Sequence, residues 1–334
     1  MAITEVTERR ETAVADERRF RREPGAKAKM LLIVNPKATT VSSRLKSLIV
    51  YALRSRFEVN ALETEAPNHA IELTREAGRA DYDLVVAFGG DGTVNEAANG
   101  LAGSRVPLSV LPGGSTNVVC RMLGIPTDVV DATEHLLSLA DELTPRPIDL
   151  GRVNSRYFVS SSGIGLDAHT TRWVDDHAPL KHRAGPFFFS YAGLVSYGRY
   201  VRRPVRIAAD VHGRRILGVS AVVQNSDPYT YFRSRPIRLC KGQALDSGSL
   251  SMVVLNRTSP LDIPSIAWRL LSSRPAVGHA QVEHCEILRE AAVEALPGER
   301  GEVTPFPIQV DGDFIEEATE ARFEIRPRSL LVVA

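Results

Sequence analysis

The sequence has 334 residues, of which 43% are hydrophobic and 24% charged, and its formal net charge at pH 7 is +1. This balance predicts a folded protein, and the length predicts two domains because single domains cluster near roughly 100 to 200 residues. The near-neutral charge excludes a dedicated nucleic-acid binder, whose affinity depends on a strongly basic face. Three widely spaced cysteines predict neither a disulfide framework nor a zinc site, and they fit a cytoplasmic protein.

Residues 1–28 carry six arginines among several acids and few apolar side chains. That composition is typical of a flexible charged tail. No apolar run approaches the roughly 18 to 20 residues that cross a bilayer, and the charged start is unlike a signal peptide. We therefore expect a chain that does not span a membrane.

The first part of the chain alternates between short apolar runs and helical spacing. Strands are predicted at 30–34, 57–62, 84–88 and 108–111. Helices are expected between them: one after residue 45, one capped by Asn68 and ended by Gly78, and a short one beginning near Thr93. Because parallel neighbours need a crossover helix, residues 29–147 are predicted to form a doubly wound α/β domain.

After Pro145-Arg146-Pro147 the pattern changes to short segments in which apolar and polar residues alternate. These segments are 148–153, 157–160, 205–211, 217–223 and 250–255. A period of two is typical of strands with one buried face, so residues 148–334 are predicted to be mostly antiparallel β.

Three loops at predicted strand ends carry the chemistry: Asn35-Pro36-Lys37-Ala38-Thr39, residues 89–93, and residues 112–117. Ligands of an open α/β sheet bind beyond the carboxyl ends of its strands, where helix N-termini present N–H groups. Glycines let the backbone approach a phosphate, and Thr93, Ser115 and Thr116 add hydroxyl groups. The three loops together predict a polyphosphate site.

Asp91 lies inside the second loop, where a carboxylate would repel a phosphate unless a cation separates them. Magnesium prefers carboxylate, water and phosphate oxygens and resolves this conflict. The alternative is that the glycines only form tight turns and that Asp91 caps the helix starting at Thr93. The P-loop pattern is absent, and a dinucleotide fingerprint is matched only weakly, at residues 163–168.

Three of these segments resemble the diacylglycerol kinase catalytic family, which includes bacterial lipid kinases and sphingosine kinases. The run from Gly89 to Leu101 resembles its central motif, Leu111–Asn117 its second glycine-rich loop, and Leu32–Pro36 its opening strand. The resemblance covers about residues 30–330. It implies an α/β nucleotide domain followed by a β-sandwich for the lipid substrate, with ATP and lipid meeting between them and the last strand returning to the first domain.

The resemblance and the loops together assign positions to ATP and magnesium. The ATP positions are Asn35, Pro36, Lys37, Ala38, Thr39, Thr64, Gly89, Gly90, Asp91, Gly92, Thr93, Val94, Asn95, Glu96, Gly113, Gly114, Ser115, Thr116 and Asn117. Asp91 and Asp246 are the metal candidates. The family's general base matches Val310-Asp311-Gly312-Asp313, so Asp311 or Asp313 is expected to take the proton from the acceptor hydroxyl. The alternative for this segment is a simple hairpin turn, since Asp-Gly is common there.

The sequence departs from the family pattern at three places. Val118 stands where the family usually has Asp, and Ser247 interrupts the usual Asp-Asp-Gly, which puts a magnesium site at Asp246 in doubt. Asp313 stands where the family has Glu, which leaves the base open between Asp311 and Asp313.

The predicted function is therefore an ATP- and Mg²⁺-dependent kinase of diacylglycerol or a similar lipid alcohol. The apolar run 187–195 lies between basic clusters, which suits docking on an anionic membrane surface at the inner face of the membrane or, alternatively, a buried helix. A kinase of a soluble acceptor, related to NAD kinases, and a catalytically disabled lipid-binding protein are the competing functions. The oligomeric state is left open, including a homodimer.

Overall fold

The computed structural model describes residues 26–176, 200, 204–232, 234–240, 243–262, 265–266, 268–269, 278–298 and 301–334. The apolar run 187–195 and the greater part of the N-terminal tail lie outside the described residues. The first half contains four parallel strands: β1 (Ala28–Val34), β2 (Phe57–Glu63), β3 (Leu84–Gly89) and β4 (Leu108–Pro112). Its helices are α2 (Ser43–Leu53), α3 (His69–Ala77), α4 (Asp91–Leu101), α5 (Val118–Leu123) and α6 (Val129–Ser138).

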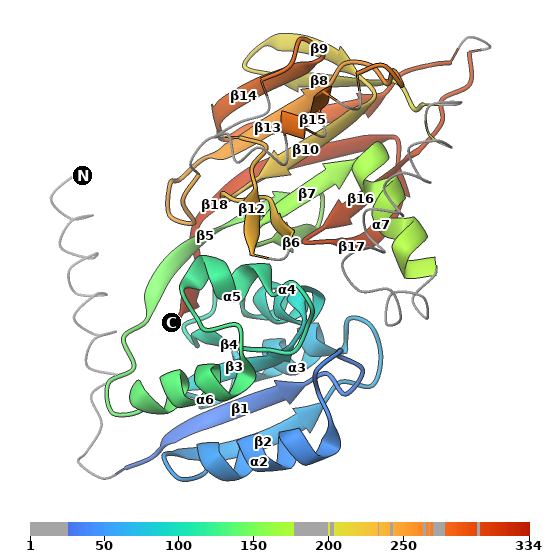
Figure 1. Cartoon of the computed structure of the whole chain (residues 1–334). Coiled ribbons are helices and arrows are strands. Elements are labelled where there is room, and N and C mark those ends of the chain that lie inside the picture. Colours follow the sequence, from blue (N-terminus) through green and yellow to red (C-terminus); the bar gives the residue numbers. More distant parts are fainter. Residues whose placement is uncertain are drawn as a thin grey trace, which may run out of the picture.

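The parallel strands lie in the order β2-β1-β3-β4. From β1 the chain passes to β2 on one side of it, and then back across β1 to β3 and β4 on the other side. Because such crossovers are right-handed, α2 lies on one face of the sheet and α3 and α4 lie on the opposite face. Figure 1 shows the helices on both faces of this sheet. Every residue of β3 and β4 is buried, as expected for strands covered on both sides. The strand order reverses between β1 and β3, which is where such folds bind ligands.

Two helix starts differ from the sequence prediction. Asn68 is the residue before α3, but it has a φ of 68° and its side chain makes no capping hydrogen bond. The carboxylate of Glu96 caps α3 instead, accepting from the backbone N–H groups of Asn68 and Ala70 at 2.8 and 3.1 Å. Helix α4 begins at Asp91 rather than near Thr93, so the capping role considered for Asp91 is wrong. Both differences arise because long-range contacts satisfy groups that local patterns leave unassigned.

The second half is built mainly from antiparallel strands. Its elements are β5 (Arg146–Val153), β6 (Arg156–Phe158), β7 (Ser161–Ile164), α7 (Leu166–Asp176), β8 (Ile207–Val211), β9 (Arg214–Gly218), β10 (Ser220–Gln224), β11 (Thr230–Phe232), β12 (Arg235–Ile237), β13 (Leu250–Leu255), β14 (Val282–Leu288), β15 (Glu290–Ala295), β16 (Phe306–Val310), β17 (Asp313–Ala318) and β18 (Glu320–Val332). One sheet runs β14-β13-β10-β7-β16-β17, and the other contains β18, β15, β8 and β9 with β5 and β6.

These two sheets share one hydrophobic core, which makes this half a β-sandwich. Phe158, Val293 and Phe323 contribute from one sheet, and Val223 and Met252 from the other. The rings of Phe158 and Phe323 meet edge to face with centroids 6.5 Å apart, a favoured aromatic geometry. The fold class predicted from the sequence is confirmed: an α/β half with a parallel sheet, followed by an antiparallel β half.

Strand β18 belongs to both halves of the molecule. Along most of its length it pairs with β5 and β15 of the sandwich, and its end pairs in parallel with β4, where Val332 is opposite Leu108. The backbone N–H of Val333 also donates to the carbonyl of Leu108 at 3.0 Å. A single ten-stranded sheet therefore continues from the α/β half into the sandwich.

The weak dinucleotide match at residues 163–168 is wrong as a nucleotide site. Gly163 lies in β7, whose neighbours β10 and β16 are both antiparallel to it. A dinucleotide fingerprint needs a parallel strand–helix–strand unit, and β7 is not part of one. Within the described ranges, no helix has the length and apolar character to cross a membrane.

Candidate active site

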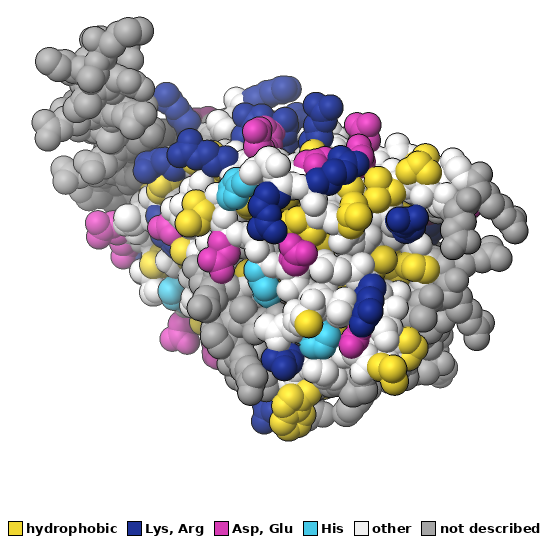
Figure 2. All heavy atoms as spheres, turned by 90° about the horizontal axis from the view of Figure 1, so that it is seen from above, with side chains coloured by type: hydrophobic (Ala, Val, Ile, Leu, Met, Phe, Trp, Pro, Cys, Tyr) yellow, Lys and Arg dark blue, Asp and Glu magenta, His cyan; other side chains and the backbone are white. Residues whose placement is uncertain are grey.

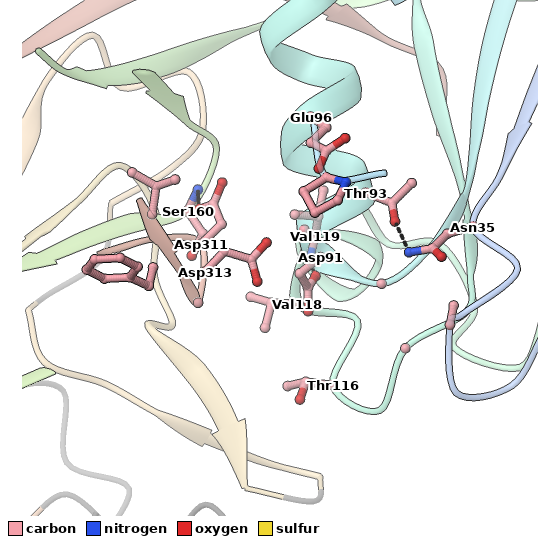
Figure 3. Close-up of a pocket in the computed structure, with 18 of the residues that line it drawn as sticks. Asn35, Asp91, Thr93, Glu96, Thr116, Val118, Val119, Ser160, Asp311 and Asp313 are labelled. Carbon is pink, nitrogen blue, oxygen red and sulfur yellow. Dashed lines mark hydrogen bonds between the residues drawn. The ribbon is translucent and has the colours of Figure 1, made fainter. Parts of the chain in front are cut away.

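A cavity of about 670 Å³ opens between the α/β half and the sandwich. Its lining combines the ends of β1, β2, β3 and β4 with the hairpin that joins β16 to β17 (Figure 3). Such a volume is typical of small-molecule sites, which bury a ligand in a concave and largely preformed pocket. The cavity begins at the reversal of strand order between β1 and β3, as the α/β topology predicts.

Backbone and side-chain contacts join the three sequence-predicted loops into one wall. Asn35 follows β1, and its Nδ2 donates to Oγ1 of Thr93 at 3.0 Å while its Oδ1 accepts from the Lys37 N–H at 2.9 Å. The N–H of Gly113 donates to the carbonyl of Gly89 at 2.8 Å. A Cβ on Gly113 would lie 2.8 Å from the Gly89 Cα, so glycine is required for this close approach. These contacts hold the three loops together as one wall.

Asp91 is the first residue of α4 and lines the cavity. Its Oδ1 accepts from the backbone N–H of Val119 at 3.2 Å, which orients the carboxylate across the mouth of the phosphate loops. A helix N-terminus stabilises a negative group placed beside it. Asp91 therefore lies among the three loops that the sequence predicted to form a polyphosphate site (Figure 3).

The residues at Asp91 fit a magnesium ion that is shared with phosphates. Magnesium usually binds through one or two carboxylates, waters and substrate phosphates rather than in an all-protein cage. Among the residues the structure describes, no three His, Cys, Asp or Glu side chains are grouped to hold a metal ion. Asp91 and Asp313 both line the cavity, so a carboxylate is available on each of its walls.

Asp311 is held by hydrogen bonds on both carboxylate oxygens. With Gly312 it forms the two-residue turn between β16 and β17, and both residues have positive φ, 48° and 89°. The hairpin predicted as the alternative is therefore present, at the edge of the cavity. The Asp311 carboxylate accepts from the N–H groups of Val159, Ser160 and Ser161 and from Nδ2 of Asn95, at 2.7 to 3.0 Å. Burial raises the pKa of Asp311, and these four donors oppose the rise.

Asp313 is placed differently, because it is exposed at the start of β17. Its carboxylate reaches across the cavity to the first turn of α4, where a Cβ added to Gly92 would overlap its Oδ2. Figure 3 shows Asp313 between the hairpin and the start of α4. Of the two candidate bases, Asp313 is the one whose carboxylate faces the phosphate loops.

This difference predicts opposite effects on stability. Asp311→Asn places an amide N–H₂ against backbone donors and should lower the free energy of unfolding by about 2 to 3 kcal/mol, the cost of unsatisfied buried donors. Asp313→Asn should change it by less than about 0.5 kcal/mol, as is usual for exposed positions. Urea unfolding of both variants checks this. Equal destabilisation would contradict the assignment of Asp311 to structure.

A second prediction concerns Gly92. Gly92→Ala should displace the Asp313 carboxylate and lower kcat by about a hundredfold, because misplacement by an ångström has effects of that size. Gly278→Ala is the control, since a Cβ there meets only one atom, at 4.0 Å. Steady-state kinetics of the two variants, with their melting temperatures, provide the comparison. An active Gly92→Ala variant would show that the approach of Asp313 to α4 is unimportant.

The structure brings most of the predicted positions to the cavity. Those that line it are Asn35, Lys37, Ala38, Thr39, Thr64, Gly90, Asp91, Gly92, Thr93, Glu96, Gly114, Ser115, Thr116, Asp311 and Asp313. The lining does not include Pro36, Gly89, Val94, Asn95, Gly113 and Asn117. Asn95 is buried and bonds to Asp311, while both polar atoms of the Asn117 side chain bond to the backbone of Gly114. These residues support the loops.

Asp246 is not brought to the cavity. It is exposed on the loop before β13, and the cavity lining does not include it. The neighbouring backbone is held by Asp149, whose carboxylate accepts from the N–H groups of Gly248 and Arg328 at 2.6 and 2.8 Å. The assignment of Asp246 as a metal ligand stays a prediction from the sequence, separate from the cavity.

The cavity also contains residues that sequence reasoning missed. Arg156 and Tyr229 come from the sandwich, and Glu65–Asn68 follow β2. Tyr229 donates to the buried Asp167, and burial raises the pKa of both groups. None of these residues lies in a glycine-rich motif, so only the fold reveals them. Val118 also lines the cavity, where the family pattern would place a carboxylate.

The site combines glycine-rich loops at the switch point of a doubly wound sheet with a β-hairpin from the sandwich that carries two aspartates. This combination is typical of a two-domain kinase. Comparison with known proteins agrees with this class. Residues 29–153 match the family model of the diacylglycerol kinase catalytic domain. The chain is 34% identical over 222 residues to the diacylglycerol kinase of Bacillus subtilis (strain 168), covering 64% of this chain and 69% of that relative.

A more distant relative and a solved structure extend the likeness over most of the chain. The diacylglycerol kinase of Staphylococcus haemolyticus (strain JCSC1435) is 24% identical over 275 residues, covering 81% of this chain and 77% of that one. A crystal structure described as a diacylglycerol kinase from Bacillus anthracis str. Sterne has a TM-score of 0.65 at 20% identity, covering 92% and 96%. The chain belongs to the diacylglycerol kinase family and is a lipid kinase.

Proposed function

We propose that this lipid kinase transfers the γ-phosphoryl group of ATP, with magnesium, to the hydroxyl of diacylglycerol or a similar lipid alcohol. The observation that carries the proposal is the cavity in which Asp91 and the phosphate loops face Asp313 across the two halves of the molecule. Magnesium, when bound, would neutralise phosphate charge beside Asp91.

The chain's own residues suit the steps of the transfer. The three loops and the N-terminus of α4 bind and orient the triphosphate, and the Lys37 side chain at the rim adds positive charge. The lipid hydroxyl oxygen attacks the γ-phosphorus, the bond to the β,γ-bridging oxygen breaks, and ADP carries away that electron pair. Asp313 accepts the hydroxyl proton. Phosphoryl transfer relies mainly on alignment and charge stabilisation, which these groups provide.

The two competing functions have less support. Family membership favours a lipid acceptor over the soluble acceptor of an NAD kinase-like enzyme. A disabled lipid-binding protein would have no need for a carboxylate at Asp91 and another at Asp313, facing each other across the cavity. Val118 removes a family carboxylate from the lining, but it leaves this pair in place.

An anionic membrane surface is the proposed setting, at the inner face of the membrane, because acyl chains hold the acceptor in a bilayer. Figure 2 shows one face of the β-rich half, on which Arg side chains gather beside hydrophobic ones, with acidic residues between them. Flotation with anionic and neutral vesicles tests this part. Equal recovery of the protein with both kinds of vesicle would show that electrostatic attraction to anionic lipid does not contribute to membrane binding.

One assay tests the proposed function as a whole. Purified protein is incubated with labelled ATP, magnesium and a panel of lipid alcohols in mixed micelles, including diacylglycerol and a sphingoid base. Label is expected in the phosphomonoester of one lipid, and omission of magnesium should abolish it. Labelling of a soluble acceptor alone, or of nothing, would reject the proposal.

A further inference from the structure

Arg156 is a positive side chain in the cavity with no assigned role. It comes from β6 of the sandwich, is half-buried, and lines the cavity together with Asp313. Its Nε donates to Oδ1 of Asn95 at 3.1 Å, and its Nη1 donates to Oδ1 of Asn68 at 2.9 Å. Both acceptors are uncharged amides. They fix the plane of the guanidinium without neutralising it.

The amide acceptors are themselves fixed. Asn95 is buried, and its Nδ2 donates to the Asp311 carboxylate at 2.7 Å and to the Tyr157 carbonyl at 2.9 Å. Asn68 lies at the start of α3, where its N–H is held by Glu96. The guanidinium is therefore positioned by both halves of the molecule, and little side-chain entropy remains to be lost when it binds a ligand.

Within the described part of the chain, Arg156 makes no ion pair and its Nη2 has no hydrogen-bond partner. Glu96, Asp313 and Asp311 are near enough to favour its charge, yet none is paired with it. Burial lowers the pKa of Arg156, and these carboxylates oppose that effect. A half-buried guanidinium held by neutral partners keeps donors available for an anion.

The charge balance of the cavity points to the kind of anion. The described lining contains five carboxylates, from Glu65, Asp91, Glu96, Asp311 and Asp313, and two cations, Lys37 and Arg156. A triphosphate adds further negative charge that one magnesium ion offsets only in part. Lys37 is exposed at the rim, whereas Arg156 extends from the sandwich to Asn68 and Asn95 of the α/β half, so that its guanidinium lies between the two halves and near the proposed base.

We propose that Arg156 is a substrate-binding residue that contacts the phosphoryl group in transfer, through the Nη2 that the two amides leave available. This proposal rests on the proposed function, because it requires ATP in the cavity. Arginine suits the role because its planar donors match phosphate oxygens and stay charged. The contact is made to the γ-phosphate of bound ATP and is kept while the phosphoryl group leaves ADP, when charge on its equatorial oxygens needs a fixed cation.

Calorimetry with magnesium, a methylene-bridged ATP analogue and ADP tests this contact. The Arg156→Met variant is expected to bind the ATP analogue about tenfold more weakly, the loss of one charged hydrogen bond, and to bind ADP within about twofold of the unaltered chain. Arg156→Lys keeps the charge, so its affinity for the ATP analogue should lie between the affinities of Arg156→Met and of the unaltered chain. Melting temperatures of both variants show whether the fold is retained.

The outcomes are distinguishable. Equal loss of affinity for the analogue and for ADP would place the contact elsewhere or make Arg156 a structural link, and unchanged affinity for the analogue would also overturn the proposal. A short-chain phosphatidate is titrated in parallel, and a loss confined to that lipid would assign Arg156 to the product headgroup instead. If the unaltered chain binds neither nucleotide, the proposed function fails, and Arg156 fails with it.

Should Arg156→Met not fold, turnover of Arg156→Lys with and without millimolar guanidinium decides the matter. A phosphoryl contact predicts a lower kcat at an unchanged KM for the lipid, together with partial rescue by guanidinium. A purely structural link predicts a lower melting temperature and no rescue.

Discussion

Asp91→Asn is expected to leave the fold intact and to lower kcat by at least a hundredfold to a thousandfold, the range found when one preorganised electrostatic group is removed. The amide keeps an oxygen that can accept from the Val119 N–H, which Oδ1 of Asp91 now does at 3.2 Å. The negative charge that would attract magnesium to the phosphate loops is lost. The measurement is steady-state transfer to lipid over a range of magnesium concentrations.

Asp141→Asn is the matched control. Asp141 is exposed and pairs only with Arg56 at the surface, an interaction that contributes little to stability. Its kcat and melting temperature should equal those of the unaltered chain. If Asp91→Asn is as active as Asp141→Asn, then magnesium is not bound through Asp91 and the proposed mechanism is wrong.

Asp313→Asn has the second large effect. An amide cannot accept the proton of the lipid hydroxyl, so kcat should fall by about 10² to 10⁴, the usual contribution of a general base. Affinity for ATP should be nearly unchanged, because the loops that bind the phosphates do not depend on Asp313. Single-turnover kinetics with saturating ATP separate the two quantities.

Glu317→Gln serves as the control for Asp313→Asn, since Glu317 lies on the same strand and its side chain forms a surface pair with Arg172. Its activity should be unchanged. A weak effect of Asp313→Asn combined with a total loss in a correctly folded Asp311→Asn variant would reverse the assignment of the base.

Much of the fold and one wall of the site were predictable from local patterns. The four parallel strands and their glycine-rich ends follow from apolar runs and turn chemistry, which act over a few residues. The capping of α3 by Glu96 was not predictable, because the carboxylate reaches it from another helix. Local signals indicated Asn68, whose side chain instead accepts from Arg156.

The residues that the sandwich contributes to the cavity could be assigned roles only from the tertiary structure. Sequence alone left Asp311 and Asp313 equivalent, and their roles separate only because the segment from the end of β6 to the first residue of β7 supplies three backbone donors to Asp311. Arg156 stands 61 positions from its partner Asn95 and belongs to no motif. Contacts of this kind depend on how the two halves meet, which no short pattern records.

Strand β18 links the two halves of the enzyme, although its register with β5 shifts between Arg326 and Leu330. Because this strand is hydrogen-bonded into the sandwich and also ends beside β4, a rotation of one half against the other must bend β18 or break its pairing with β4. The width of the cavity between the two halves is therefore coupled to the strand pairing of β18.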